Sequence, residues 1–296
     1  MRALAWAAVA AVFLLMTAGN VVSATGSGLA CPDWPLCHGR LIPPIQLDVL
    51  IEYSHRLLAA ATSVLLIGTI VATIRDRRSR GVRRVGVGLL VLLGAQIALG
   101  GVTVLFRLPH LISTLHLVNA LLILAGLLAL VSRAEPADEI PAKVWRLTRA
   151  GLAALLCQLA LGGYVRHAGA GLACPDFPLC GGDVFPGHWL GIVHWFHRWL
   201  GVALLGFFVH LALAARGTRV AGAAATVAGL ALLQVSLGIA TVLLGLAPAI
   251  RAIHASVGYL LWATLVWVSL RVGGWDRVLG DAVARRADAF EVAHAP

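Results

Sequence analysis

The chain has 296 residues, of which 60% are hydrophobic and only 12% are charged. A soluble domain would carry about 25% charged residues, so the composition excludes the soluble globular class. Apolar runs of about 20 residues, long enough to cross the hydrocarbon core of a bilayer, recur along the chain. The formal charge of +10 could indicate nucleic-acid binding, but the basic residues gather in alternate connections between the apolar runs. The positive-inside rule places such connections in the cytoplasm, so we attribute the charge to membrane topology and expect no nucleic-acid partner.

The apolar runs predict an all-α integral membrane protein with eight transmembrane helices and with both termini in the cytoplasm. The outer connections 23–50 and 166–189 are long, whereas the other two outer connections are tight. The first run, preceded by Arg2, also resembles a cleaved signal peptide. The predicted spans are Ala3–Val22, Ile51–Ile74, Val85–Phe106, Leu111–Val131, Leu147–Val165, Leu190–Ala215, Val220–Leu246 and Ile250–Leu270.

An internal repeat divides the chain into two similar halves. Residues 26–39 read GSGLACPDWPLCHG and residues 169–182 read GAGLACPDFPLCGG, which gives 11 identities in 14 positions at an offset of 143. Residues 96–105 (QIALGGVTVL) resemble residues 234–243 (QVSLGIATVL) at an offset of 138. Each half contains four spans and so enters and leaves the membrane on the same side, which predicts a parallel repeat of two four-helix bundles. Because the fifth span cannot be a signal peptide, its counterpart, the first span, is expected to be retained.

The repeat and the charge pattern predict four segments along the chain. Residues 1–135 form the N-terminal four-helix half, and residues 136–143 form a cytoplasmic linker rich in acidic residues and proline. Residues 144–271 form the C-terminal four-helix half. Residues 272–296 form a cytoplasmic tail, to which we assign no chemistry.

Four histidines lie in phase with the repeat: His55 and its counterpart His197, and His116 and its counterpart His254. Each is predicted to lie one or two turns below the outer end of its helix, and the two helices of each half that carry them run in the same direction. Two parallel helices of one bundle then offer opposed imidazoles at one depth, which is what a six-coordinate heme iron needs.

Other interpretations of these histidines are weaker. One intramembrane histidine could be a hydrogen-bonded core residue, but ionisable groups in lipid are costly, and four related by a repeat favour iron ligation. A zinc site would need cysteine or carboxylate ligands at the same depth, which the sequence lacks there. Arg56 and Arg198 each follow a candidate ligand. Two interpretations stay open for them: a side chain that reaches the membrane interface, or a guanidinium that pairs with a heme propionate.

Cysteine pairs with five intervening residues occur in both long outer loops, as Cys31 and Cys37 and as Cys174 and Cys180. The compartment outside the membrane is oxidising, so we expect two disulfides. A structural role is favoured over a redox-active one, because the spacing differs from that of low-pKa Cys-X-X-Cys sites. Cys157, inside the fifth span, is predicted to be a small buried apolar residue.

The two halves differ next to the predicted iron ligands. Glu52 lies one turn from His55, on the same helix face, and the repeat places His194 at the equivalent position. An acid near the edge of the hydrocarbon is costly and favours a functional role, although pairing with an outer-loop arginine such as Arg40 is an alternative. The difference predicts an enzyme in which the N-terminal half carries the reaction.

The motifs ATGSGLACPDWPLCHG, IEYSHR, TLHLVNAL and GGYVRHAGAGLACPDFPLC resemble those of heme A synthases of the bacterial branch with cysteines in the outer loops. The resemblance implies oxidation of the C8 methyl group of heme O to a formyl group, which gives heme A for terminal oxidases. It also implies heme B as a cofactor in the C-terminal half, a heme O site in the N-terminal half, and an essential glutamate. The corresponding residues are His197 and His254 for heme B, His55 and His116 for heme O, Glu52 for the catalytic glutamate, and Cys31–Cys37 and Cys174–Cys180 for the disulfides.

Three alternatives belong to other classes of protein. A diheme electron-transfer cytochrome would bind two permanent hemes, and a heme carrier would bind one exchangeable heme, both without altering the porphyrin. A thiol oxidoreductase is disfavoured by the cysteine spacing. The difference at Glu52 favours an enzyme over the cytochrome, and two complete ligand pairs favour it over the carrier. We expect a multi-pass protein of a bacterial or archaeal plasma membrane with its heme sites towards the outer face, with a heme O synthase or further copies of the chain as candidate partners.

Overall fold

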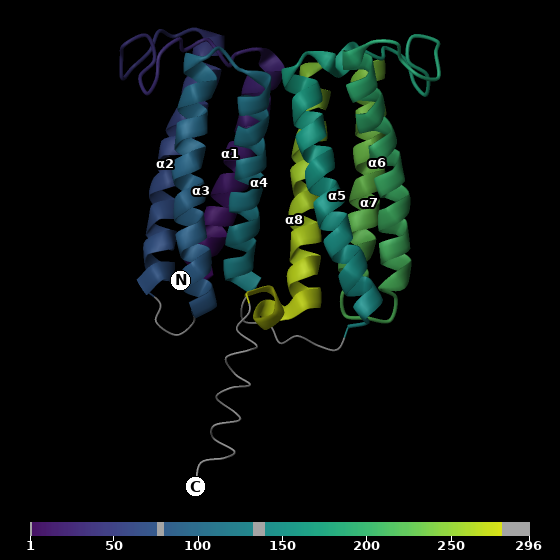
Figure 1. The fold of residues 1–296 in the computed structure, drawn as a ribbon. Coiled ribbons are helices and arrows are strands. Elements are labelled where there is room, and N and C mark those ends of the chain that lie inside the picture. The colour runs from purple at the N-terminus through teal and green to yellow at the C-terminus, as the bar shows by residue number, and fades with distance from the viewer. Residues whose placement is uncertain (1, 76–79, 133–139, 280–296) are drawn as a thin grey trace.

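A computed structural model describes residues 2–75, 80–132 and 140–279, with side chains up to residue 273. Within these residues the chain forms eight long α-helices and one short 3-10 helix, and each long helix is long and apolar enough to cross a membrane (Figure 1). The all-helical, eight-span prediction is confirmed for this part of the chain. The elements are α1 (Arg2–Thr25), α2 (Leu47–Arg75), α3 (Arg80–Leu105), α4 (His110–Ser132), α5 (Ala142–His167), η1 (Ala170–Leu172), α6 (Trp189–Ala214), α7 (Ala221–Leu243) and α8 (Pro248–Leu279).

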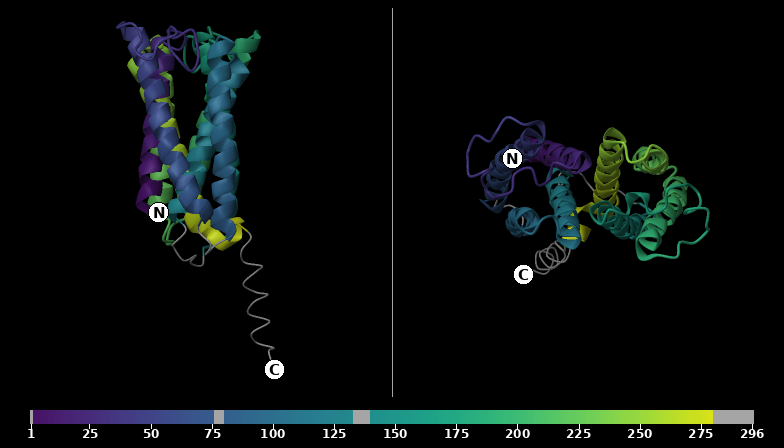
Figure 2. Two further views of the ribbon diagram at one scale, coloured as in Figure 1. Left: turned by 90° about the vertical axis from the view of Figure 1, so that its left-hand side faces the viewer. Right: turned by 90° about the horizontal axis from the view of Figure 1, so that it is seen from above.

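The helices pack as two rings of four. In the first ring α1 contacts α2, α2 contacts α3, α3 contacts α4, and α4 closes the ring on α1. In the second ring α5 to α8 contact one another in the same order. Between the rings α4 contacts both α5 and α8, and α1 contacts α8. Figure 2 shows the two rings side by side when viewed along the helix axes.

The two helices at the centre of this arrangement are the most buried. In the most apolar stretch of each helix, 50% of the residues of α4 and 39% of those of α8 are buried, against 17% to 33% in the other helices. The indole N–H of Trp262 on α8 donates to the carbonyl of Leu121 on α4 at 2.9 Å, which joins the rings at the centre of the molecule. The remaining helix surface is exposed and apolar, as expected of residues that face lipid.

Four connections lie at one end of the bundle (Figure 1). They are the long loops 26–46 and 168–188 and the tight turns after α3 and α7. The tight turns place Leu108 and Leu246 at positive φ angles of 60° and 63°. Each leucine side chain packs against a glycine of the neighbouring long loop, Gly28 and Gly171 respectively, where an added Cβ would lie only 3.1–3.4 Å away. These contacts seat each long loop on a tight turn, directly above the helix ends.

The structure corrects the end of the last helix and one burial prediction. The last helix continues to Leu279, beyond the predicted end at Leu270, so part of the predicted tail 272–296 is helical. The rest of that tail, from residue 280, and residues 136–139 of the predicted linker lie outside the described residues. Cys157 is exposed rather than buried. In a membrane helix an apolar side chain suits lipid as well as a protein core, so hydrophobicity does not tell the two faces apart.

Candidate functional site

The four predicted ligand histidines occupy equivalent positions in the helices. His55 and His197 lie eight residues after the first residue of α2 and α6, and His116 and His254 lie six residues after the first residue of α4 and α8. These numbers correspond to depths of about 12 Å and about 9 Å below the helix starts. The four imidazoles thus lie at a similar depth, which agrees with the depth expected from the sequence.

Each histidine imidazole packs against a glycine of the preceding helix in the same four-helix ring. At each glycine, a Cβ would lie within 2.7–3.3 Å of the histidine Cε1 atom, closer than ordinary van der Waals contact. Any larger residue would therefore push the imidazole away from its neighbour helix. The contacts are Gly19 with His55 (3.2 Å), Gly100 with His116 (3.3 Å), Gly162 with His197 (2.7 Å) and Gly238 with His254 (3.2 Å).

The ring nitrogens of the four histidines are poorly satisfied by the protein itself. The Nδ1 atom of every one is buried and has no hydrogen-bond partner among the described residues. The Nε2 atom of His116 lies 3.2 Å from the side-chain nitrogen of Gln96, and that of His254 lies 3.5 Å from the side-chain nitrogen of Gln234. Buried polar atoms normally have partners. Four unsatisfied imidazoles in one molecule therefore indicate a binding function.

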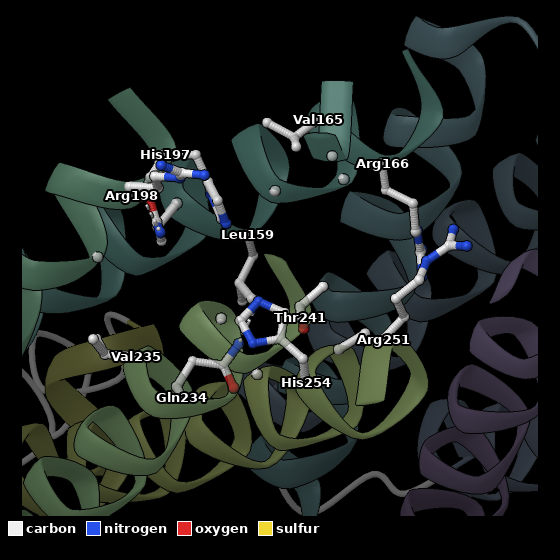
Figure 3. Close-up of a pocket in the computed structure, with 18 of the residues that line it drawn as sticks. Leu159, Val165, Arg166, His197, Arg198, Gln234, Val235, Thr241, Arg251 and His254 are labelled. Atoms are coloured by element: carbon white, nitrogen blue, oxygen red, sulfur yellow. Dashed lines mark hydrogen bonds between the residues drawn. The ribbon is translucent and has the colours of Figure 1, made fainter. Parts of the chain in front are cut away.

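A cavity of about 250 Å³ lies inside the second ring of helices and is lined by both His197 and His254. Its wall is mainly apolar, with residues such as Leu159 and Val235, as a macrocycle with an apolar periphery requires. Figure 3 shows the two histidines on opposite sides of this space, one from α6 and one from α8. In the first ring, His55 and His116 are close enough to interact electrostatically.

Glu52 and Arg56 hold the long loop between α1 and α2. The Glu52 side chain is buried, with an exposed fraction of 3%, although it is acidic. Its Oε2 atom accepts the backbone N–H of Cys31 at 2.8 Å, and its Oε1 atom pairs with Arg56 Nη2 at 2.5 Å. Arg56 also donates to the carbonyl oxygens of Cys31 and Asp33, at 2.9 Å and 2.7 Å, and to that of Leu36. The alternative pairing of Glu52 with Arg40 is wrong, because the partner is Arg56.

His194 and Arg198 hold the long loop between α5 and α6 in the same way. His194 Nδ1 lies 3.4 Å from the backbone nitrogen of Cys174, and His194 Nε2 lies 3.2 Å from Arg198 Nε. The Arg198 Nη atoms donate to the carbonyls of Asp176, at 2.6 Å, and of Leu179 and Cys174. A neutral imidazole can accept at only one nitrogen, whereas a carboxylate accepts at both oxygens. Glu52 therefore accepts from both the Cys31 N–H group and Arg56, whereas His194 can accept from only one of its two neighbours.

Each loop is also closed internally. The structure contains the disulfides Cys31–Cys37 and Cys174–Cys180, which confirms the predicted pairing. Inside the first loop, Asp33 accepts the backbone N–H groups of Gly39 and His38, and the bond from Gly39 holds the pKa of the carboxyl group below its usual value. In the second loop, Asp176 accepts those of Gly181 and Gly182, and the bond from Gly181 lowers its pKa in the same way.

Comparison with known proteins now places this arrangement in a family. A family model described as "Cytochrome oxidase assembly protein" matches residues 2–266. The chain is 32% identical to the heme A synthase of Alkalihalophilus pseudofirmus over 213 residues, which cover 68% of this chain and 72% of the relative. The chain belongs to the heme A synthase family. It is also 29% identical to the heme A synthases of Bacillus licheniformis and Bacillus pumilus, over 69% and 68% of this chain and 72% and 69% of those relatives.

The residues present in the second ring of helices fit a heme, the group that membership of the heme A synthase family implies. Two imidazoles with unsatisfied nitrogens line one apolar cavity, and glycines leave room for both rings. The predicted propionate contacts of Arg56 and Arg198 stay predictions. The structure gives the Nη atoms of both guanidinium groups other partners, in the outer loops.

Several site residues were not singled out from the sequence. Of the four glycines next to the histidines, Gly100 and Gly238 lie in the repeated segments QIALGGVTVL and QVSLGIATVL. The other two lie outside these segments. The same segments begin with Gln96 and Gln234, which face the histidines. Repetition of a glutamine inside an apolar span was the available signal, because a buried amide needs a partner.

Proposed function

We propose that this protein is a heme A synthase, which oxidises the C8 methyl group of heme O to a formyl group and so makes heme A for terminal oxidases. The observation that carries the proposal is the pair of histidines in each ring of helices, each seated on a glycine and left with unsatisfied nitrogens, in a chain of this family. An electron carrier needs two such pairs as well, but it does not need a buried carboxylate in one half alone.

The proposed architecture is a parallel repeat of two four-helix bundles, with the N-terminal half at 1–135 and the C-terminal half at 144–271. The linker 136–143 joins them, and residues 272–296 follow as a tail. Both termini are cytoplasmic in this proposal, and the heme sites lie towards the outer face of a bacterial or archaeal cell membrane. The same order of helix contacts in the two rings and the basic residues opposite the long loops support it.

In the proposed assignment His55 and His116 bind the substrate heme O, and His197 and His254 bind heme B as a cofactor. Heme B, when bound, supplies one-electron redox chemistry. The chain itself positions the hemes and separates their roles. A heme O synthase that delivers the substrate and association between copies of the chain are further proposals.

Glu52 is proposed to act as a base or to position water near the methyl group of the substrate. Its place supports this role, because it lies one turn from His55 and the outer loop covers it. The bonds to Arg56 and to the Cys31 N–H group fix the direction of the carboxylate. Each carboxylate oxygen keeps a further lone pair with which it can accept a hydrogen bond from water.

The test of the reaction is heme extraction and chromatography from cells that express this chain together with a heme O synthase. We expect heme A with the wild type and none with His55→Ala. The matched control is His210→Ala, which removes an exposed histidine from α6 and should leave heme A production intact. Heme O and heme B alone from folded wild-type protein would refute the synthase proposal and favour the electron-transfer or carrier alternative.

A second test separates the chemistry of Glu52 from its contact with the loop. The C-terminal half shows that a histidine at this position can still face the loop N–H group and the arginine. Glu52→His should therefore keep the loop in place and retain heme, but lose heme A production, and Glu52→Gln should do the same. If Glu52→His made heme A at the wild-type level, the carboxylate would have no part in the reaction.

A further inference from the structure

Two arginines at the outer end of the C-terminal cavity have no role in the proposal above. Arg166 lies in the last turn of α5, and Arg251 lies in the first turn of α8. Both line the cavity that contains His197 and His254. Figure 3 shows their side chains extending towards each other at one end of the cavity, and their charges are close enough to interact.

The protein does not neutralise this pair of cations. The one salt bridge found among the described residues is the Glu52–Arg56 pair in the other half. Arg166 donates from Nη1 to Asn20 Oδ1 at 2.9 Å, but its Nε atom is buried and has no partner in the described part of the chain. Arg251 makes a long contact of 3.4 Å from Nη1 to the carbonyl of Ala24. Two adjacent guanidinium groups at the edge of the hydrocarbon are costly unless an anion joins them.

We infer that Arg166 and Arg251 bind the propionate carboxylates of the heme that His197 and His254 hold; this inference rests on the function proposed above. Arg251 precedes His254 by three residues, and so lies one turn nearer the outer end on the same face of α8. Arg166 follows Gly162, the glycine beneath the His197 ring, by four residues and so lies one turn nearer the outer end of α5. Both cations therefore stand at the same level, one turn above the imidazoles.

Guanidinium groups suit this ligand well. A guanidinium presents a planar fork of donors that matches a carboxylate, and two of them match the two propionates in number and in charge. Asn20 and Tyr259 support the arrangement, since Asn20 Oδ1 accepts from both the Tyr259 hydroxyl, at 2.7 Å, and Arg166. Bonds of this kind hold Arg166 in place before the ligand arrives, which lowers the cost of ordering it.

The N-terminal half lacks both arginines. The repeat offsets of 143 and 138 place Ser23 opposite Arg166 and Ser113 opposite Arg251. Ser113 is buried and its hydroxyl has no partner among the residues described. Of the nearby cations of that half, Arg40 and Arg107 are exposed, and Arg56 is paired with Glu52. The C-terminal half is thus built to retain its heme, whereas the N-terminal half binds through its histidines and can release a product.

The test uses the full chain carrying His55→Ala, so that the C-terminal histidine pair alone holds heme B. The variants are Arg166→Gln, Arg251→Gln and both together, with the exposed Arg107→Gln as a matched control. Release of heme B to an excess of apomyoglobin should become about tenfold faster or more for each single variant, as expected for the loss of a charge-assisted bond. The midpoint potential should fall, because removal of a positive charge favours the oxidised iron. Arg107→Gln should change neither quantity.

Heme B dimethyl ester, in which both carboxylates are blocked, provides a readout that a merely structural role would not move. The ester should leave the His55→Ala protein as fast as heme B leaves the double variant, and the arginine variants should not release it faster. If the variants released heme B and its ester faster by the same factor, or if they released heme B at the control rate, the inference would be wrong. Heme A production is measured separately in cells with a heme O synthase, so its absence would overturn the proposed reaction without affecting the propionate result.

Discussion

Gly162 supplies the tightest contact with a predicted iron ligand, and its replacement by alanine gives a quantitative test of the site. A Cβ at this position would lie 2.7 Å from His197 Cε1 and 3.3 Å from its Nδ1 atom. Carbon atoms in contact lie about 3.5–4.0 Å apart, so the imidazole would have to move by about 0.8 Å or more. A functional group must be held within about 0.5 Å of its working position, and this shift exceeds that tolerance.

The expected cost of Gly162→Ala follows from the displacement. Overfilling a packed site costs about 1–3 kcal/mol, which corresponds to about 5-fold to 150-fold weaker binding of heme to the C-terminal pair. Alanine is also a better helix former than glycine by about 1 kcal/mol, so the effect on helix stability has the opposite sign. Gly206→Ala on α6 meets nothing within 4 Å and is the matched control. It should bind heme as the wild type does.

The assay is the heme content of the purified protein, made in cells that supply heme B only, together with the low-spin absorption spectrum of two-histidine coordination. His55→Ala in the background restricts the signal to the C-terminal half. We expect Gly162→Ala to lose heme or its low-spin spectrum, and Gly206→Ala to keep both. Wild-type heme content and spectrum in Gly162→Ala would refute the role of this glycine in placing His197.

Three further variants test separate parts of the structure. The hydrogen bond from Gly181 lowers the pKa of Asp176 below its ordinary value of 3.8. The ionised carboxylate therefore stabilises the fold above the unfolded-state pKa, and this stabilisation is lost as the pH falls through the lower folded-state pKa. Hydrogen-exchange protection of the Gly181 amide should fall there in the wild type, and Asp176→Asn should show no such step. Gln96→Leu removes the side chain that faces the ring of His116, and heme O binding in a titration should weaken about tenfold. Asn20→Leu leaves two buried donors without an acceptor, and unfolding in detergent should show a stability lower by about 2 kcal/mol or more.

The helices and the disulfides could be predicted because the information for them is local. Apolar runs of sufficient length specify membrane spans, since every backbone polar group in lipid must be bonded within its own helix. The disulfide Cys31–Cys37 could be predicted because its cysteines lie six residues apart in one loop, which the positive-inside rule assigns to an oxidising compartment. The depth of His55 and His116 followed from their distance to the helix starts.

The contacts around the ligands could not be predicted from one sequence. Whether Gly162 faces His197 or lipid depends on the rotation of two helices about their axes, which the apolar pattern of a membrane helix does not specify. The alternative partner considered for Glu52 was a loop arginine, but Arg56 on the same helix reaches the loop backbone and the carboxylate together. Arg166 on α5 and Arg251 on α8 lie near each other in space although they are far apart in the sequence.

The differences between the halves agree with the separate heme roles proposed for them. In N-terminal and C-terminal order, the differing pairs are Glu52 and His194, Ser23 and Arg166, and Ser113 and Arg251. A cofactor stays bound through many reactions, whereas a substrate must enter and its product must leave for use elsewhere. The half with two unneutralised arginines therefore suits the cofactor, because its charge complements two carboxylates. In the same proposal, the half with serines holds its ligand by the histidines and keeps one neutral pair, Glu52 with Arg56. Each of the four imidazoles contacts a glycine of the preceding helix in both halves, so the two proposed sites seat their predicted iron ligands alike and differ in the charge near the long loops.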